Sequence, residues 1–308
     1  MNNLGESLAK INLEGRVLPD EPLGPLTTFA VGGPADALIY PASFEDIRRV
    51  RIFCQNEGVP LFVMGRGANL LIADRGIRGV TLNLTSLNKL RVDDGILVAQ
   101  AGLDVSQAID FCLEKSLSSL EFLYGMPSSV GGAVWMNARC YGHEIADIFA
   151  HARVLNEHHE FAEIPFTGGD WDYKVSPFQK QDWIILEAGF RTQTKAAKEI
   201  LDVMRNNLAD RTQKGHFRLP CAGSVFKNDR RWGEPSGVLI ERCGLKGLRK
   251  GRAVVSNWHA NIIVNEGGAL ASDIRSLIAE VRQRVFNQMG FLLEEEVIYA
   301  GDWALPNP

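Results

Sequence analysis

Apolar residues in the first third of the chain follow two alternating spacings. ADALIYPAS and VPLFVMG contain the short apolar runs that are typical of strands, whereas FEDIRRVRIFCQNEG between them repeats its apolar residues at helical spacing. Ser43 is suited to cap this helix at its start, and Gly58 is suited to end it. The pattern therefore predicts a β–α–β unit.

The rest of the chain changes pattern near Ala196. Before it, GVTLNL, LRVDDGILVAQAG, AHARVLNE and WIILEAGF predict short strands, and VSQAIDFCLEKSL predicts a helix that Asp104 caps. A charged helix, KAAKEILDVMRNNLADRTQ, follows, and we place a domain boundary within residues 192–215. Beyond it, helix, strand, helix and strand are predicted for SGVLIERCG, VVSNWHANIIVN, ALASDIRSLIAEVRQRVFNQMG and FLLEEEVIYAG.

Composition excludes several classes of protein. The 308 residues include 33 basic and 37 acidic side chains, and a net charge of −4 gives no general attraction for nucleic acid or anionic membranes. No segment approaches the roughly 20 apolar residues of a membrane span, and the first residues lack a signal-peptide core, so we expect a cytoplasmic protein. The five cysteines are widely spaced and predict neither disulfides nor zinc. His259 has no second histidine at ligand spacing, so no metal site is expected.

Glycine-rich segments occur three times, in PLTTFAVGGPADALIYP, GRGANLL and GMPSSVGGAVWMNA. Glycine lets backbone N–H groups approach an anion closely, so these segments could bind a diphosphate. A lone segment of this kind is more often a tight turn, but GRGANLL and GMPSSVGGAVWMNA together favour a ligand, whereas for PLTTFAVGGPADALIYP a turn and a cofactor loop are equally plausible. None matches the dinucleotide fingerprint or a P-loop. A bound flavin or nucleotide would therefore require a fold other than the Rossmann type.

Polar residues with chemical potential lie in the last third. Ser224 in LPCAGSVFKN could donate a proton to an enolate, although a serine in such a segment is more often a turn residue. In LLEEEV, strand alternation places Glu294 and Glu296 on one face and Glu295 on the other. Arg211, Lys214 and Arg218 form a basic group ahead of Ser224 that could bind phosphate or carboxylate, or could lie in solvent.

Taken in order, these motifs resemble one family, the flavoprotein UDP-N-acetylenolpyruvoylglucosamine reductases of bacterial cell-wall synthesis. The resemblance rests on PLGPLTTFAVGGPA, GRGANLLIAD, GMPSSVGGAVWMNARCYGHE, DYKVSPF, AGSVFKN, GVLIERCGLKG, VVSNWHANIIVN and LEEEV. These stretches run from about residue 22 to residue 301. The chain resembles the shorter form of the family, without a substrate-capping insertion between Phe178 and Lys214.

The resemblance implies an α+β fold with an FAD-binding module of the vanillyl-alcohol-oxidase (p-cresol methylhydroxylase) type. Residues 1–85 and 86–195 would form its two subdomains, and residues 196–308 a smaller α+β substrate-binding domain. It implies an oxidoreductase in which NADPH reduces non-covalently bound FAD, which then reduces UDP-N-acetylglucosamine enolpyruvate to UDP-N-acetylmuramate. Such an enzyme serves peptidoglycan synthesis, and with it cell-wall biogenesis, cell shape and cell division. We expect a monomer without a nucleic-acid partner or membrane insertion.

The resemblance also implies roles for individual residues. Ser224 would be the proton donor, Glu296 would assist at the enolate, and Lys174 would be the third catalytic group. The residues expected to bind FAD are Val31, Gly32, Gly33, Gly65, Arg66, Gly67, Ala68, Asn69, Leu70, Gly125, Pro127, Ser128, Ser129, Gly131, Gly132 and Asn137. Those expected to bind the UDP-sugar are Arg211, Lys214, Lys227, Asn228, His259 and Asn261.

The sequence departs from the family pattern at a few of these positions. Lys174 stands where the family has arginine, which keeps the charge but loses the bidentate fork. Ala68 replaces a serine, Ser128 replaces a glycine, and Arg139-Cys140 stands where Gly-Ala is common. Two alternatives therefore remain: a non-catalytic paralogue that binds FAD or a UDP-sugar, and a flavin oxidoreductase of the same superfamily that acts on another substrate.

Overall fold

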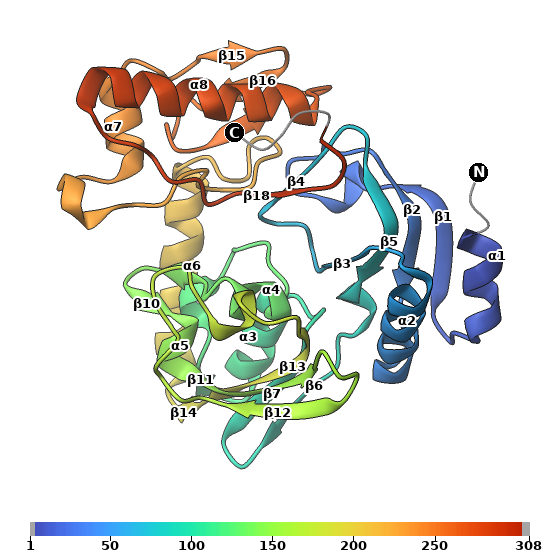
Figure 1. Cartoon of the computed structure of the whole chain (residues 1–308). Helices are drawn as coiled ribbons and strands as arrows, with labels where there is room; N and C mark the ends of the chain where they lie inside the picture. The colour runs from blue at the N-terminus through green and yellow to red at the C-terminus, as the bar shows by residue number, and fades with distance from the viewer. Residues whose placement is uncertain (1–3, 304–308) are drawn as a thin grey trace. The chain divides into compact units, whose positions relative to one another are not determined.

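The computed structural model describes residues 4–303 (Figure 1), and these divide into two compact units that interleave along the chain. Among the described residues, unit 1 contains 4–19, 37–66 and 79–210, and unit 2 contains 20–36, 67–78 and 211–303. This division differs from three consecutive domains, because residues 20–36 and 67–78 belong with the C-terminal third. Three strands cross the division: β1 (Arg16–Pro22), β2 (Pro34–Tyr40) and β5 (Ile77–Asn83). With β3 (Leu61–Met64) they form a sheet in the order β1-β2-β5-β3.

Unit 1 contains a five-stranded sheet in the order β12-β11-β13-β7-β6 whose neighbouring strands are antiparallel. Its strands are β6 (Leu90–Asp93), β7 (Ile96–Gln100), β11 (Phe149–Leu155), β12 (Phe161–Pro165) and β13 (Ile184–Arg191). Seven of the eight residues of β13 are buried, as expected for a strand in the middle of a sheet. Short α4 (Val130–Trp135) packs against β7 and β13.

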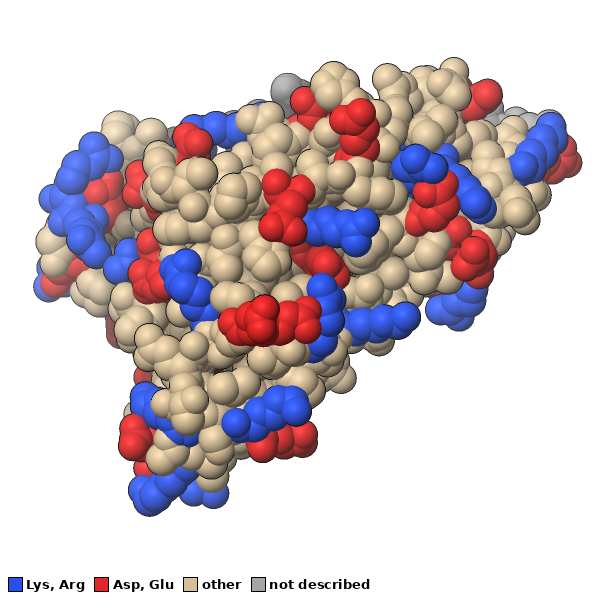
Figure 2. Space-filling model, turned by 90° about the horizontal axis from the view of Figure 1, so that it is seen from below, with Lys and Arg blue, Asp and Glu red and all other residues tan. Residues whose placement is uncertain are grey.

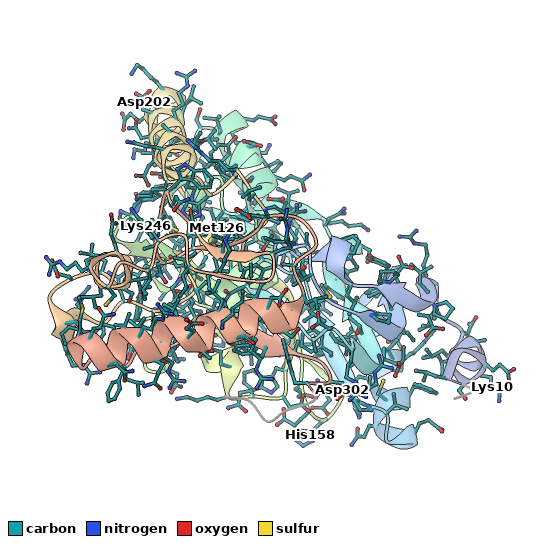
Figure 3. All side chains as sticks on the ribbon, turned by 90° about the horizontal axis from the view of Figure 1, so that it is seen from above. Lys10, Met126, His158, Asp202, Lys246 and Asp302 are labelled. Carbon is teal, nitrogen blue, oxygen red and sulfur yellow. The ribbon has the colours of Figure 1, made fainter. Side chains whose placement is uncertain are left out.

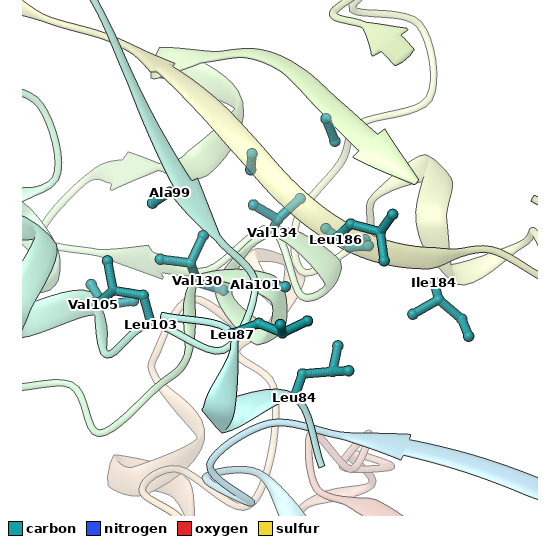
Figure 4. Close-up of a cluster of buried hydrophobic side chains, with 14 of the residues drawn as sticks. Leu84, Leu87, Ala99, Ala101, Leu103, Val105, Val130, Val134, Ile184 and Leu186 are labelled. Atoms are coloured by element: carbon teal, nitrogen blue, oxygen red, sulfur yellow. The ribbon is translucent and has the colours of Figure 1, made fainter. Parts of the chain in front are cut away.

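Apolar side chains from this sheet and its neighbours form the core of unit 1. Figure 4 shows part of it, where Val130 and Val134 of α4 lie beside Ala101, Leu103 and other residues that are almost completely buried. At about 25 cal/mol per Å² of apolar surface removed from water, each large side chain here contributes roughly 1.5–3 kcal/mol. The core therefore fixes α4, and with it the glycine-rich segment in which α4 lies.

The two other helices predicted for unit 1 begin where their sequences predict, and the first also ends there, whereas the second ends at Glu114, three residues before the predicted end. In α2 (Phe44–Glu57) the Ser43 hydroxyl accepts the Asp46 N–H at 3.1 Å, and Gly58 ends the helix with a φ of 63°. Asp104 caps α3 (Val105–Glu114) by accepting the Ser106 N–H at 2.8 Å. The smaller elements are α1 (Leu4–Leu8), β8 (Leu117–Ser118), β9 (Arg139–Cys140), β10 (His143–Glu144), α5 (Ile145–Ile148) and β14 (Gln193–Thr194).

Helix α6 (Ala197–Gln213) leads into the main part of unit 2. There the long helix α8 (Ala271–Met289) packs against the three-stranded sheet β15-β16-β17 (Figure 1). Its buried face, which includes Ile274, Leu277, Ile278, Val281 and Val285, belongs to the core of this unit. The other elements are β4 (Leu70–Ile72), α7 (Ser236–Arg242), β15 (Arg249–Lys250), β16 (Ala253–Val255), β17 (Ile263–Asn265) and β18 (Ile298–Ala300).

Three segments differ from the sequence-based expectation. GMPSSVGGAVWMNA contains helix α4 as well as a loop, because Ser129 caps the helix and the core holds it despite two glycines. VVSNWHANIIVN forms β16 and β17 with a turn between them, since the Ser256 hydroxyl accepts N–H groups within that turn. FLLEEEVIYAG contributes only β18 as regular strand, preceded by an isolated bridge between Glu295 and Phe226.

The surface carries both signs of charge. Figure 2 shows Lys and Arg side chains interspersed with Asp and Glu over the face it draws, as expected for a net charge of −4. Among residues 4–303, the helices are all too short or too polar to cross a membrane.

Candidate functional site

The glycine-rich segments of unit 1 meet at Ser129. A Cβ atom on Gly65 would lie 2.1 Å from the Ser129 hydroxyl oxygen, so only glycine allows this approach. The same hydroxyl accepts the Gly132 N–H at 3.3 Å, and the Gly131 N–H donates to the Ala101 carbonyl at 2.8 Å. The fold therefore brings two motifs about 60 residues apart in sequence into contact around one hydroxyl.

A basic and a polar group flank this contact. Arg66 lies 3.2 Å from Asp104, and its side chain remains 43% exposed. Ser128 is buried, and its hydroxyl donates to the Ser129 carbonyl at 3.0 Å. Gly125 has a φ of 78° and Pro127 is exposed (Figure 3 labels Met126 between them).

The remaining glycine-rich positions lie in unit 2. Gly67 has a φ of 62°, and a Cβ atom there would lie 2.4 Å from the Leu26 carbonyl oxygen. Thr28 joins the two segments, because its N–H donates to the Gly67 carbonyl at 3.3 Å and its hydroxyl donates to the Ala68 carbonyl at 3.0 Å. The Gly33 N–H donates to the Ala73 carbonyl at 2.9 Å. Ala73 directly follows β4 in the motif GRGANLLIAD. The neighbouring candidates are Val31, which is buried, and Gly32, Ala68 and Leu70, which are partly exposed.

The segments that contain Ser224 and Glu296 lie side by side in unit 2. The Glu296 N–H donates to the Val225 carbonyl at 2.7 Å, and the Lys227 N–H donates to the Glu294 carbonyl at 2.8 Å. On its other side the Ser224 segment is bonded to residues 261 and 262 through the Val225 N–H and a bridge between Ser224 and Ile262. Both candidate catalytic side chains are half-buried. The fold thus places Glu296 beside the residue that follows Ser224.

Two of the three consecutive glutamates pair with different cations. The Glu294 carboxylate pairs with the Lys227 ammonium at 2.6 Å. Glu295 faces α8, where its carboxylate lies 3.8 Å from Arg282. Burial and the nearby Glu295 carboxylate raise the pKa of the Tyr299 phenol. Glu294 and Glu295 thus face different partners, as neighbouring residues of an extended segment do.

Cys221 lies three residues before Ser224, and its sulfur is 3.6 Å from the His216 carbonyl oxygen. Burial raises the pKa of its thiol, with a smaller opposing effect from a backbone hydrogen bond at Gly223. The group is therefore a neutral thiol at neutral pH, which does not favour a nucleophilic role.

Lys174 lies in unit 1 at the tip of a tight turn. The Asp172 and Val175 backbones exchange two hydrogen bonds, at 3.1 and 2.9 Å, and Lys174 between them has a φ of 60°. A residue with a Cβ atom in this region costs about 1 kcal/mol or more in backbone strain. Arg139 stacks on the Tyr173 ring at 5.7 Å and lies 3.6 Å from Glu144. Arg139, which stands where the family commonly has glycine, therefore packs against Tyr173, the residue that precedes Lys174.

Two polar side chains near this turn bond to its backbone and to that of α4. The Ser176 hydroxyl, which is completely buried, donates to the Trp135 carbonyl at 2.7 Å. The Gln179 amide donates to the carbonyls of Trp135 and Lys174, at 2.8 and 2.9 Å. The motif DYKVSPF indicates Ser176 as a polar candidate from the sequence, whereas no sequence signal marks Gln179.

The residues expected to bind a UDP-sugar lie in unit 2. The Asn228 side-chain oxygen accepts the Ser236 N–H at 2.9 Å, where α7 begins. The His259 ring accepts the Asn261 N–H at 3.2 Å and lies near the ring of His216, with centroids 6.3 Å apart. Arg211 is buried in the last turns of α6, and Lys214 beyond it is exposed.

The donor groups of the glycine-rich segments suit an anionic, phosphate-containing cofactor. Around Ser129 they are small residues, hydroxyl groups and the exposed guanidinium of Arg66, and Arg66 also neutralises the nearby Asp104. Backbone segments pack closely around Gly33 and Gly67. None of the candidate cofactor-binding residues in these segments is acidic. The chemistry of these groups therefore fits a flavin dinucleotide better than a metal ion or a cationic ligand.

Comparisons with known proteins match two parts of the chain to different families of protein domain. Residues 35–161 match the family described as "FAD binding domain", and residues 213–300 match "UDP-N-acetylenolpyruvoylglucosamine reductase, C-terminal domain". The chain is 42% identical to the UDP-N-acetylenolpyruvoylglucosamine reductase of Treponema denticola, over 98% of this chain and 100% of the relative. It is 36% identical to that of Borreliella burgdorferi, over 97% and 98% of the two chains. The crystal structure of the Thermus caldophilus reductase covers 94% of this chain at 30% identity, with a TM-score of 0.78.

Proposed function

Because the chain belongs to the UDP-N-acetylenolpyruvoylglucosamine reductase family, we propose how its own residues carry out the reduction of UDP-N-acetylglucosamine enolpyruvate to UDP-N-acetylmuramate. The family resemblance seen in the motifs is confirmed, and so is the α+β fold with an FAD-binding domain. The protein is an FAD-dependent oxidoreductase of peptidoglycan precursor synthesis that acts on a UDP-sugar with a nicotinamide co-substrate.

Bound FAD supplies the hydride chemistry, which it carries from NADPH to the β-carbon of the enolpyruvyl group. We propose that the backbone of Gly65, Gly67 and Gly33 and the Ser129 hydroxyl line the site that holds it, with Arg66 near its diphosphate. Support comes from the close approach of Gly65 to Ser129 and from the exposed guanidinium of Arg66. We propose that the guanidinium of Arg66 offsets the hydroxyl absent at Ala68, since it is exposed and can bind a phosphate oxygen.

We propose that Ser224 donates the proton that the substrate α-carbon takes up, while Glu296 assists at the enolate. A carboxylate-stabilised enolate is basic enough to take a proton from a positioned hydroxyl, and a neighbouring acid stabilises its charge. The observation that carries this assignment is the bond between the Glu296 N–H and the Val225 carbonyl at 2.7 Å. It fixes the two segments against each other before any substrate binds.

Lys174 is the proposed third catalytic group, a cation that stabilises the charge developing on the substrate carboxylate. The positive φ of Lys174 supports this role, because backbone strain of this kind is often retained at functional sites. Lysine offers a point charge where arginine offers two parallel donors, so its position must be set by the turn. The proposed contacts to the UDP-sugar come from Arg211, Lys214, Lys227, Asn228 and His259.

The decisive experiment measures the two half-reactions separately by stopped-flow absorbance of the flavin. Ser224→Ala should leave flavin reduction by NADPH within about twofold of wild type and slow reoxidation by the enolpyruvyl substrate by roughly 100- to 10,000-fold, the usual contribution of a general acid. Ser276→Ala is the matched control, because Ser276 is an exposed serine on α8 whose hydroxyl donates to the Ser272 carbonyl, and it should leave both half-reactions unchanged. Equal slowing of both half-reactions by Ser224→Ala would contradict the proton-donor role.

The arginine of the family provides a second test. Lys174→Arg should retain at least about a tenth of the wild-type turnover, because the charge is kept and the turn is unchanged. Lys174→Met should slow turnover far more, with flavin content unaffected. If Lys174→Arg is as slow as Lys174→Met, the site has been rebuilt around lysine.

Two further alternatives make opposite predictions. A non-catalytic paralogue would bind FAD without oxidising NADPH in the presence of the enolpyruvyl substrate. An oxidase of the same superfamily would oxidise NADPH in the absence of that substrate and yield peroxide.

We propose a monomer in the cytoplasm, where nucleotide-sugar substrates and NADPH are found. Size-exclusion chromatography with light scattering tests the oligomeric state.

A further inference from the structure

Three asparagines of the motifs use their side-chain amides to hold the backbone of the three proposed catalytic segments. We propose that Asn261, Asn137 and Asn69 are positioning residues for Ser224, Lys174 and Glu296, respectively. The inference rests on the proposed function and assigns these amides to the catalytic segments in place of ligand contacts. Each case is carried by its own hydrogen bonds.

Asn261 holds the segment of Ser224. Its side-chain oxygen accepts the Phe226 N–H at 2.9 Å, and its side-chain nitrogen donates to the Phe226 carbonyl at 2.8 Å. Both backbone groups of one residue are thus bound by one amide, as a neighbouring strand would bind them. Its own carbonyl accepts the Val225 N–H at 2.8 Å. Asn261 is only 2% exposed even without a ligand, which leaves almost no surface for contact with a substrate.

Asn137 holds the turn of Lys174. Its side-chain nitrogen donates to the Asp172 carbonyl at 2.9 Å, and its side-chain oxygen accepts the Ala146 N–H at 3.0 Å. The residue has no exposed surface, and its φ of 41° is unusual for a residue with a side chain. Gln179 holds the other side of the same turn through the Lys174 carbonyl. The strained turn is therefore fixed at Asp172 and at Lys174.

Asn69 holds the segment of Glu296. Its side-chain nitrogen donates to the Glu296 carbonyl at 2.8 Å, across 227 positions of sequence. Its own carbonyl accepts the Ile298 N–H at 2.9 Å, where β18 joins β4. The backbone of Glu296 is thus bonded on both sides, to Asn69 through its carbonyl and to Val225 through its N–H.

An asparagine suits this role because its amide offers a donor and an acceptor in one plane. Aspartate has the same shape but replaces the donor with an oxygen that repels the carbonyl it faces. Displacement of a reacting group by about 1 Å can slow catalysis by roughly 100-fold. Each Asn→Asp variant should therefore slow reoxidation of the flavin by substrate by about 10- to 100-fold, with flavin reduction by NADPH and the Kd for FAD within about twofold of wild type.

A double-mutant cycle separates positioning from general damage. Asn261→Asp should have little further effect on reoxidation in a Ser224→Ala background, because its effect acts through that hydroxyl. Asn137→Asp should likewise lose its effect with Lys174→Met, and Asn69→Asp with Glu296→Gln. Asn206→Asp is the matched control, since Asn206 is exposed on α6, and it should leave both half-reactions unchanged.

Several results would overturn the inference. If Asn261→Asp or Asn137→Asp instead raises KM for the substrate or the Kd for FAD with an unchanged reoxidation rate constant, these amides contact ligands. If the effects multiply in the double variants, the asparagines act on stability alone. If a variant does not fold, Gln179→Leu tests the turn from its partly buried side, and wild-type reoxidation with that variant would refute positioning. A wild-type protein that forms no UDP-N-acetylmuramate would refute the proposed function itself.

Discussion

Asp74 of the motif GRGANLLIAD makes a stability prediction that follows directly from its contacts. Its two carboxylate oxygens accept the N–H groups of Ala271 and Ser272, at 2.6 and 3.0 Å, in the first turn of α8. The residue that precedes this helix, Leu270, provides no side-chain cap. A residue 197 positions earlier in the sequence therefore caps the longest helix of unit 2.

The cost of removing this cap can be worked out from its parts. Loss of a side-chain cap costs about 0.5–2 kcal/mol, and a negative charge near a helix N-terminus contributes about 0.3–1 kcal/mol more. Asp74→Ala should therefore reduce the free energy of unfolding by about 2 kcal/mol. Asp74→Asn keeps one acceptor oxygen and loses the charge, so it should cost about 1 kcal/mol. For a chain of 308 residues, 2 kcal/mol corresponds to a drop in Tm of about 3 °C.

The assay is thermal unfolding of the FAD-loaded protein at low and high salt, followed by circular dichroism. Asp302→Ala is the matched control, because the pair of Asp302 with Arg75 spans 3.6 Å between side chains that are 40% and 64% exposed and should contribute little. High salt should reduce the difference between Asp74→Asn and wild type, since it screens the charge. Equal Tm values for Asp74→Ala and Asp302→Ala would refute the capping role.

Other predictions concern the cofactor site and the thiols. Gly65→Ala should abolish retention of FAD on gel filtration, because its methyl group would meet the Ser129 hydroxyl, whereas Gly169→Ala, with open space around it, should retain the flavin. Burial raises the pKa of Cys54 to about 11 and that of Cys112 to about 12, so both thiols are neutral at pH 8 and should react with a thiol reagent far more slowly than the partly exposed Cys140. Since these folded-state values exceed the usual value of 9.0, the stability that the neutral thiols provide should be lost as pH rises from about 9 towards 11, and urea midpoints that stay constant over this range would contradict it.

Local chemistry allowed the sequence to predict much of the fold. The caps at Ser43 and Asp104 and the glycine after α2 are confirmed, because each depends on residues within one helical turn. Strands predicted from alternating or continuous apolar residues are also present, for example β13. Helix α4 was missed because its glycines disfavour a helix locally and only packing against β7 and β13 stabilises it.

Contacts between residues far apart in the sequence limit how much of the candidate site could be predicted. Local reasoning favoured Ser224 as a turn residue, and the order of motifs along the chain changed that interpretation. The partners of Asp74, Asn69 and Gln179 could not be predicted, because no periodicity records which carbonyl or N–H group lies opposite a polar side chain. The interleaving of the two units is hidden for the same reason.

The pairing of β4 with β18 has a consequence for how the chain folds during synthesis. Leu70, Leu71 and Ile72 pair in parallel with Ile298, Tyr299 and Ala300, so β4 leaves the ribosome long before its partner. At about 5–20 residues per second, the delay is on the order of ten to fifty seconds. During that interval the glycine-rich segment from Gly65 to Asn69 is attached to an unpaired apolar strand. The part of the proposed FAD site that lies in unit 2 is therefore completed late, and a chaperone that shields β4 should raise the yield of flavin-loaded protein.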